Sequence, residues 1–192
     1  FERHKEILMR SAKNFSLIIL IIIIVLGVLS FYNNDIYNNI HDFLLNRLGW
    51  FVLIMYLINR GSVVTQAMFY NCDHAMLRYN FYREPDVILG LFKKRLTMLI
   101  KINLLPAIVI AIGSIVLLGI TTDGSLVINY IMVPLFIIVL SVFFSVHYLV
   151  IYYLLQPYNK DLQVRSISYT FVSFITLVLT YMLSNLVMSS LY

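Results

Sequence analysis

The stretch FSLIILIIIIVLGVLSFY, residues 15–32, contains no charged side chain and is dominated by Ile, Leu and Val. About 20 apolar residues in a helix, each rising about 1.5 Å, are long enough to cross the hydrocarbon core of a bilayer. A mixed-charge segment precedes the stretch, no small-residue cleavage site accompanies it, and a polar segment follows. It therefore predicts a retained transmembrane helix and not a signal peptide.

The rest of the chain has the same character. Its 192 residues are 61% hydrophobic and only 12% charged, whereas a soluble domain has about a quarter charged residues. Further apolar runs occur at 50–70, 101–120, 127–155 and 168–188. The short alternating strands of a membrane barrel are absent, and helices are the other structure that satisfies its backbone within a bilayer. The sequence predicts an all-α polytopic membrane protein, a single transmembrane domain over 1–192 with five transmembrane helices.

Basic residues gather in three of the segments that connect these runs. Residues 1–14 hold four, residues 71–101 hold six and residues 156–167 hold two, which makes twelve of the fourteen Lys and Arg residues. Because cytoplasmic loops carry the excess of Lys and Arg, the N-terminus is predicted to be cytoplasmic and the C-terminus outside. The same distribution explains the net charge of +5 without a nucleic-acid partner. Whether a sixth span follows the fifth stays open.

Two segments have the pattern of helices at the membrane surface. Residues 1–14 carry apolar side chains at roughly helical spacing among charges, which is typical of an interfacial helix in contact with membrane lipids. Residues 71–100 predict a cytoplasmic helical elbow between spans two and three. Within that elbow, EPD at 84–86 is typical of a helix start, with proline in the first turn and acids beside it.

The elbow also carries a cluster of aromatic and Arg side chains before the proline. Two functions fit this segment: an interfacial helix whose lysines bind anionic headgroups, or a docking element for a cytoplasmic partner. Tyr and Arg are enriched in the residues that dominate binding at protein interfaces, which favours docking. The candidate docking residues are Arg78, Tyr79, Phe81, Tyr82, Arg83 and Asp86.

A second group of candidates consists of polar residues within the spans. Arg60 interrupts the second span, and a guanidinium inside a membrane costs at least a few kcal/mol unless it meets a cavity, a partner or headgroups. It either lines a polar pathway or extends toward the surface. His147 in the fourth span either contacts a substrate or hydrogen-bonds a neighbouring helix. The candidate translocation path comprises Asn59, Arg60, Ser62, Gln66 and His147.

Motifs for catalysis, cofactors and metals are absent from the sequence. There is no GxxxxGK[ST] loop for ATP phosphates and no HExxH. Cys72, Asp73 and His74 are adjacent, but three successive side chains cannot converge on one ion from a helix, and no second cluster completes a shell. The sequence therefore predicts no catalytic, cofactor-binding or metal site in this chain.

The order of these elements resembles the membrane subunit of a bacterial ABC transporter, and the closest type is the ABC-2-like exporters. The resemblance is one of architecture over most of the chain: an N-terminal amphipathic helix, two spans, a cytoplasmic elbow and closely spaced further spans, five in place of the usual six. The elbow sequence D-x-x-x-L-R-Y-x-F-Y-R-x-P at 73–85 is similar to elbows of this family.

The resemblance implies a multi-pass permease in the bacterial plasma membrane that forms a translocation path. It also implies a coupling helix at the elbow that docks on a separate cytoplasmic ATP-binding cassette subunit, where the ATP is bound, and a homo- or heterodimer of membrane subunits. Few charged groups within the spans favour an amphipathic peptide or a lipid-like molecule as cargo. The alternative is a non-transporting membrane scaffold or accessory subunit.

Overall fold

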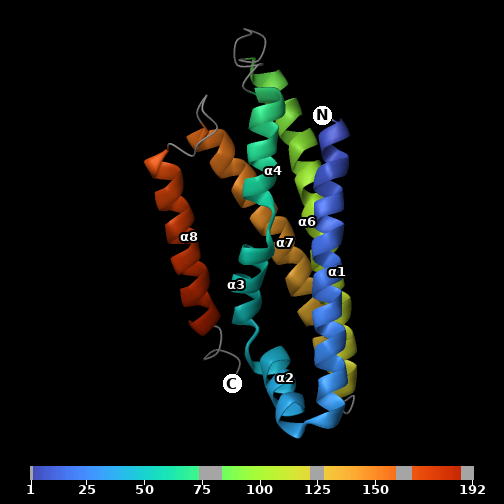
Figure 1. Ribbon diagram of the computed structural model, residues 1–192. Helices are drawn as coiled ribbons and strands as arrows, with labels where there is room; N and C mark the ends of the chain where they lie inside the picture. Colours follow the sequence, from blue (N-terminus) through green and yellow to red (C-terminus); the bar gives the residue numbers. More distant parts are fainter. Residues whose placement is uncertain (1, 74–83, 122–127, 159–165, 187–192) are drawn as a thin grey trace.

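The computed structural model describes residues 2–73, 84–121, 128–158 and 166–186, and almost all of them are helical (Figure 1). Five of the described segments are long and apolar enough to cross a membrane. This agrees with the predicted all-α membrane protein and indicates a multi-pass chain. The start of α6 at Pro85 also agrees with the helix start predicted at 84–86.

Three long helices pack side by side, with α6 (Pro85–Thr121) between α1 (Glu2–Tyr32) and α7 (Asn129–Leu155). The most extensive contact is between α6 and α7, followed by that between α1 and α6 (Figure 1). Small and branched side chains are completely or almost completely buried where these helices meet, among them Ala107, Leu118, Val133 and Ile137. Tight packing of this kind holds helices together where lipid removes most of the hydrophobic driving force.

The first helix is longer than the sequence pattern predicts. Residues 1–14 were expected to form a separate interfacial helix, whereas α1 continues through residue 14 without interruption. Neither Gly nor Pro lies near residue 14, and Ser16 Oγ donates to the Ala12 carbonyl at 2.8 Å across the expected junction. The helical hydrogen bonds therefore pass from the charged segment into the apolar one.

The connection after α1 forms a second helix, α2 (Asn34–Asn46). Asn33 caps it, because the Asn33 Oδ1 atom accepts from the Asp35 amide at 2.8 Å. Tyr37 Oη and His41 Nδ1 of α2 both donate to the Thr121 carbonyl, at 3.0 and 2.8 Å. These bonds satisfy the last carbonyl of α6 and fix α2 across one end of the bundle (Figure 1).

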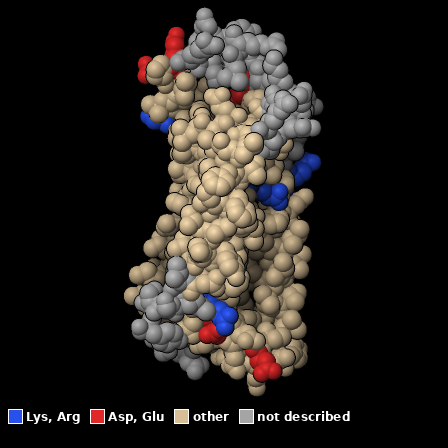
Figure 2. All heavy atoms as spheres, turned by 90° about the vertical axis from the view of Figure 1, so that its left-hand side faces the viewer, with Lys and Arg blue, Asp and Glu red and all other residues tan. Residues whose placement is uncertain are grey.

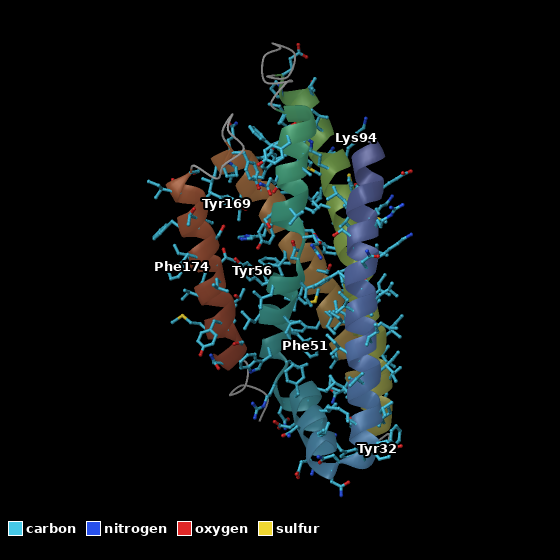
Figure 3. All side chains as sticks on the ribbon, in the orientation of Figure 1. Tyr32, Phe51, Tyr56, Lys94, Tyr169 and Phe174 are labelled. Atoms are coloured by element: carbon cyan, nitrogen blue, oxygen red, sulfur yellow. The ribbon has the colours of Figure 1, made fainter. Side chains whose placement is uncertain are left out.

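The segment predicted as one span over 50–70 is divided. It consists of α3 (Gly49–Ile58), α4 (Gly61–Met68) and a π-helical turn, η1 (Phe69–Asp73). The last helix, α8 (Ile167–Leu186), packs mainly on α3 and has little contact with α7. Tyr56 lies between α3 and α8 (Figure 3), and its hydroxyl donates to the Ser173 carbonyl at 3.1 Å.

Three of the described glycines, Gly49, Gly61 and Gly113, lie at close helix contacts, and at Gly49 and Gly61 the nearest atom is a backbone atom or a Cβ atom. A Cβ atom on Gly49 would lie 2.7 Å from the Ser184 carbonyl oxygen, where α3 meets α8. A Cβ atom on Gly61 would lie 2.4 Å from the Tyr148 Cβ atom, where α4 meets α7. Neither distance is compatible with a side chain, so both crossings require glycine.

The start of α1, the end of η1 and the start of α6 share one end of the bundle, while α2 lies at the other (Figure 1). Lys94 and Tyr32 mark these two ends (Figure 3). On the face seen in Figure 2, acidic groups lie toward both ends, basic groups also lie near mid-height, and an uncharged belt lies between these basic groups and the charged groups at the lower end. Such a belt suits a bilayer, and the side that faces the cytoplasm stays a prediction from the distribution of basic residues.

We expect Gly61→Ala to lower the free energy of unfolding by about 1–3 kcal/mol, because the added methyl group overlaps Tyr148. The matched control is Gly119→Ala on α6, where nothing lies within 4 Å of the added Cβ atom. That change should be neutral or should stabilise by about 0.5–1 kcal/mol through helix propensity. Thermal unfolding of both variants in detergent tests this, and equal melting temperatures would contradict the close α4–α7 contact.

Candidate functional site

Buried polar side chains join neighbouring helices at two levels of the bundle. One level is the base of the elbow, where Asp73 ends η1 and Arg95 lies on α6. The other is the break between α3 and α4 at Asn59 and Arg60. In a bundle surrounded by lipid, both levels must satisfy their polar atoms within the protein.

At the elbow base, Asp73 and Arg95 form a buried ion pair with both side chains 5% exposed. Arg95 Nη1 donates to Asp73 Oδ2 at 2.8 Å, and Arg95 Nη2 donates to Asp73 Oδ1, so the contact is bidentate. The Tyr152 hydroxyl also donates to Asp73 Oδ2. Arg95 Nη1 donates further to the Tyr153 hydroxyl at 2.9 Å. We name Asp73, Arg95, Tyr152 and Tyr153 the elbow clamp.

The elbow clamp joins three helical segments. Asp73 belongs to η1, which continues from α4, Arg95 belongs to α6, and the two tyrosines belong to α7. Phe92 packs edge-on against Tyr153 with 5.3 Å between ring centroids, which adds an apolar contact beside the charges. A planar guanidinium held by two carboxylate oxygens has little freedom to rotate, so the clamp fixes the end of η1 against α6 and α7.

At the helix break, side chains replace the missing helical hydrogen bonds. Asn59 Oδ1 accepts from the Gly61 amide at 2.7 Å, and Asn103 Oδ1 accepts from the Arg60 amide at 2.9 Å. Asn103 is 2% exposed on α6, and its Nδ2 atom donates to Ser145 Oγ of α7 at 2.9 Å. The break is therefore supported by buried amide and hydroxyl groups from two neighbouring helices.

The Arg60 side chain points from this break toward α1. Its guanidinium lies over the ring of Phe15, 4.6 Å from the ring centroid, in a cation–π contact. A groove of about 370 Å³ adjoins it. The groove is lined by Arg10, Ser11, Asn14, Phe15, Ile18 and Arg60, and we name it the Arg10–Arg60 groove.

The other predicted path residues lie elsewhere. On α4, the Ser62 carbonyl accepts from the Tyr158 hydroxyl at 3.1 Å, and Gln66 Nε2 donates to the Tyr70 hydroxyl at 3.0 Å. Burial raises the pKa of Tyr158, which keeps this hydroxyl a donor. His147 Nε2 lies 3.1 Å from Thr176 Oγ1 of α8. Of the predicted path residues, Arg60 lines the Arg10–Arg60 groove, whereas Asn59, Ser62, Gln66 and His147 are not among its lining residues.

Most of the predicted docking residues lie outside the described part of the chain. Asp86 is described, and it is exposed in the first turn of α6. Of the adjacent triplet at 72–74, the Asp73 carboxylate binds Arg95. The docking residues outside the described ranges are Arg78, Tyr79, Phe81, Tyr82 and Arg83.

We expect Asp73→Asn to lower the free energy of unfolding by about 3–5 kcal/mol, because it leaves the Arg95 charge buried without its counter-charge. The matched control is Asp42→Asn, since Asp42 also pairs with an arginine, Arg47, but with side chains 43% and 48% exposed. Hydrogen bonds from Asn46 and Arg47 lower the pKa of Asp42. An exposed pair contributes about 0–1 kcal/mol, so the control should change little.

Thermal and denaturant unfolding in detergent at neutral pH would measure both variants. An equal loss of unfolding free energy in the two variants would show that the Asp73–Arg95 pair is solvated, which would contradict a buried elbow clamp.

Comparison with known proteins gave no relative. No protein-family model, no curated protein and no solved structure matches this chain. A function for this chain must therefore be inferred from its own sequence and contacts.

Proposed function

We propose that this chain is the membrane subunit of an ATP-driven exporter of the ABC type, with its elbow at 71–100 docked on a separate cytoplasmic ATPase. The elbow clamp is the observation that carries this proposal. A coupling element must transmit movement from outside the membrane to several spans at once, and a flexible tether would dissipate that movement. The clamp supplies a stiff connection, because one bidentate ion pair and two tyrosines hold η1, α6 and α7 together.

The positions of the clamp residues support this function further. Asp73 immediately precedes residues 74–83, and Arg95 follows them on α6. Both ends of the segment that carries the aromatic and Arg cluster are therefore joined through one ion pair. A partner that displaced the elbow would move α4, α6 and α7 together rather than unwind a single helix.

A coupling mechanism also requires a span that can bend, and the break at Asn59 and Arg60 divides the second span into two helices. A span divided into two short helices can change the angle between them without losing the hydrogen bonds within either half. The proposed cycle begins when ATP closes the ATPase pair, which moves the elbow. The clamp then transmits this motion to α4, and the α3–α4 angle changes to open a path outward between two membrane subunits.

The cargo that fits these spans is an amphipathic peptide or a lipid-like molecule. Few charged side chains lie within the described spans, and Arg60 is half-buried. A small polar solute would require a set of polar groups converging on one cavity. The exposed surfaces of α1 and α8 are instead apolar, and they suit a cargo that enters from the membrane.

We expect a cytoplasmic ATPase encoded beside this chain to co-purify with it in mild detergent, and Arg83→Glu to abolish that association by reversing a charge in the elbow. The matched control is Arg47→Glu, a charge reversal at the α2 end of the bundle. Retention of the ATPase by Arg83→Glu, or purification of the chain without an ATPase, would overturn the proposal and favour a scaffold or accessory subunit.

A double variant separates docking from transmission. Asp73→Leu with Arg95→Met replaces the buried ion pair by apolar side chains, a change that is often neutral for stability. We expect this variant to retain the ATPase but to lose the change in ATP hydrolysis that the membrane subunit causes in the intact complex. Hydrolysis equal to that of the unmodified complex would show that the clamp does not transmit the motion.

A further inference from the structure

Two arginines that form no ion pair with a described residue line the Arg10–Arg60 groove. Arg10 is exposed on α1 and Arg60 is half-buried at the helix break. Across the residues that the structure describes, the ion pairs involve Arg47 and Arg95 and neither of these two. Both positive charges are therefore left to meet an anion that is not part of the described chain.

The Arg60 side chain is positioned by its surroundings. Its backbone amide is bound by Asn103, and its guanidinium rests on the Phe15 ring at 4.6 Å from the centroid. On α1, Arg10, Asn14 and Ile18 follow one another at intervals of four residues, so they lie along one side of the helix. The groove is thus lined by the positioned Arg60, the exposed Arg10 and the polar residues Ser11 and Asn14.

The depth of the groove in the membrane indicates the kind of anion. Arg10 is near the start of the span Leu8–Tyr32. Phe15, on which Arg60 rests, lies about 10 Å farther along the helix axis from Leu8. Because the charges of α1 end at Lys13 and an uncharged run begins at Phe15, we place this interval at the boundary between headgroups and hydrocarbon, where lipid phosphates are present.

The groove continues into an apolar surface. Beyond Asn14, the side chains of Ile18, Ile21, Ile22 and Val25 are 55%, 59%, 52% and 49% exposed on α1. A ligand that places an anion between the guanidinium groups would therefore extend its apolar part over this surface. Guanidinium groups bind phosphate oxygens in a bidentate manner, which adds geometry to the attraction of charge.

We propose that the Arg10–Arg60 groove binds the phosphate of an anionic phospholipid, with an acyl chain along the exposed surface of α1. This site goes beyond the transport function and needs neither the ATPase nor the elbow. It assigns Arg60 a defined membrane ligand in place of a general position in a pathway.

The test measures lipid binding to the purified full chain in dodecyl maltoside micelles by native mass spectrometry and by titration. The probes are phosphatidylglycerol, phosphatidylcholine and inorganic phosphate. Phosphatidylglycerol should bind most tightly, because the choline cation offsets the phosphate charge and inorganic phosphate lacks the acyl chain. We expect Arg60→Gln and Arg10→Gln each to weaken phosphatidylglycerol binding about tenfold, as loss of a hydrogen bond to a charged group does.

The matched control is Lys13→Gln, which removes one exposed positive charge on the same helix outside the groove lining. It should leave the affinity for phosphatidylglycerol unchanged. Arg60→Lys keeps the charge and should retain part of the affinity, which distinguishes lost binding from misfolding at the break.

Three results would overturn the proposal. An equal loss of phosphatidylglycerol affinity in Lys13→Gln would show a diffuse attraction of anionic lipid. Unchanged binding in the Arg10→Gln, Arg60→Gln double variant would show that the lipid does not bind in this groove. Binding of inorganic phosphate as tight as that of phosphatidylglycerol would identify a free anion as the ligand.

Discussion

A backbone polar group that faces the hydrocarbon core must find its partner inside the protein, because acyl chains offer none. This constraint explains why side chains form hydrogen bonds to the backbone where the second span is interrupted. The amide groups exposed by the break at Asn59 and Arg60 are bound by Asn59 itself and by Asn103 of α6. The Asp73 carboxylate is likewise bound by Arg95 and Tyr152. Each irregularity is thus fixed by side chains from neighbouring helices, and those side chains set how α4 sits against α6 and α7.

Much of the fold could be predicted because hydrophobic run length is a local property. The five apolar segments and the helix start at Pro85 follow directly from the sequence. The continuity of α1 through residue 14 was not predicted, because the change from charged to apolar composition there resembles a helix boundary. Backbone hydrogen bonds form regardless of that change in composition. The break in the second span was signalled by Asn59 and Arg60, but its geometry depends on Asn103, which is 43 residues away. Local patterns cannot show such a partner.

The residues of the elbow clamp were not predicted for the same reason, because they are far apart in the sequence. Asp73 and Arg95 are 22 residues apart and belong to different helices, and Arg95 is one of several basic residues in its segment. No spacing rule distinguishes it from Lys93 or Lys94, which are exposed on the same helix. A single acidic residue at the end of an apolar span was the available signal, because a carboxylate there requires a cation nearby. Among the predicted path residues, Arg60 lines a groove beside α1, whereas His147 contacts Thr176 of α8.

The attachment of α8 has a mechanical consequence. It packs mainly on α3, with backbone so close at Gly49 that the two helices have no room for an added methyl group. The half of the second span from Gly49 to Ile58 therefore carries α8 with it, and both halves of the span also contact α7. A change of angle at Asn59 and Arg60 would therefore move α3 and α8 together. A small tilt of α3 about that point would sweep the whole length of α8 through the surrounding lipid.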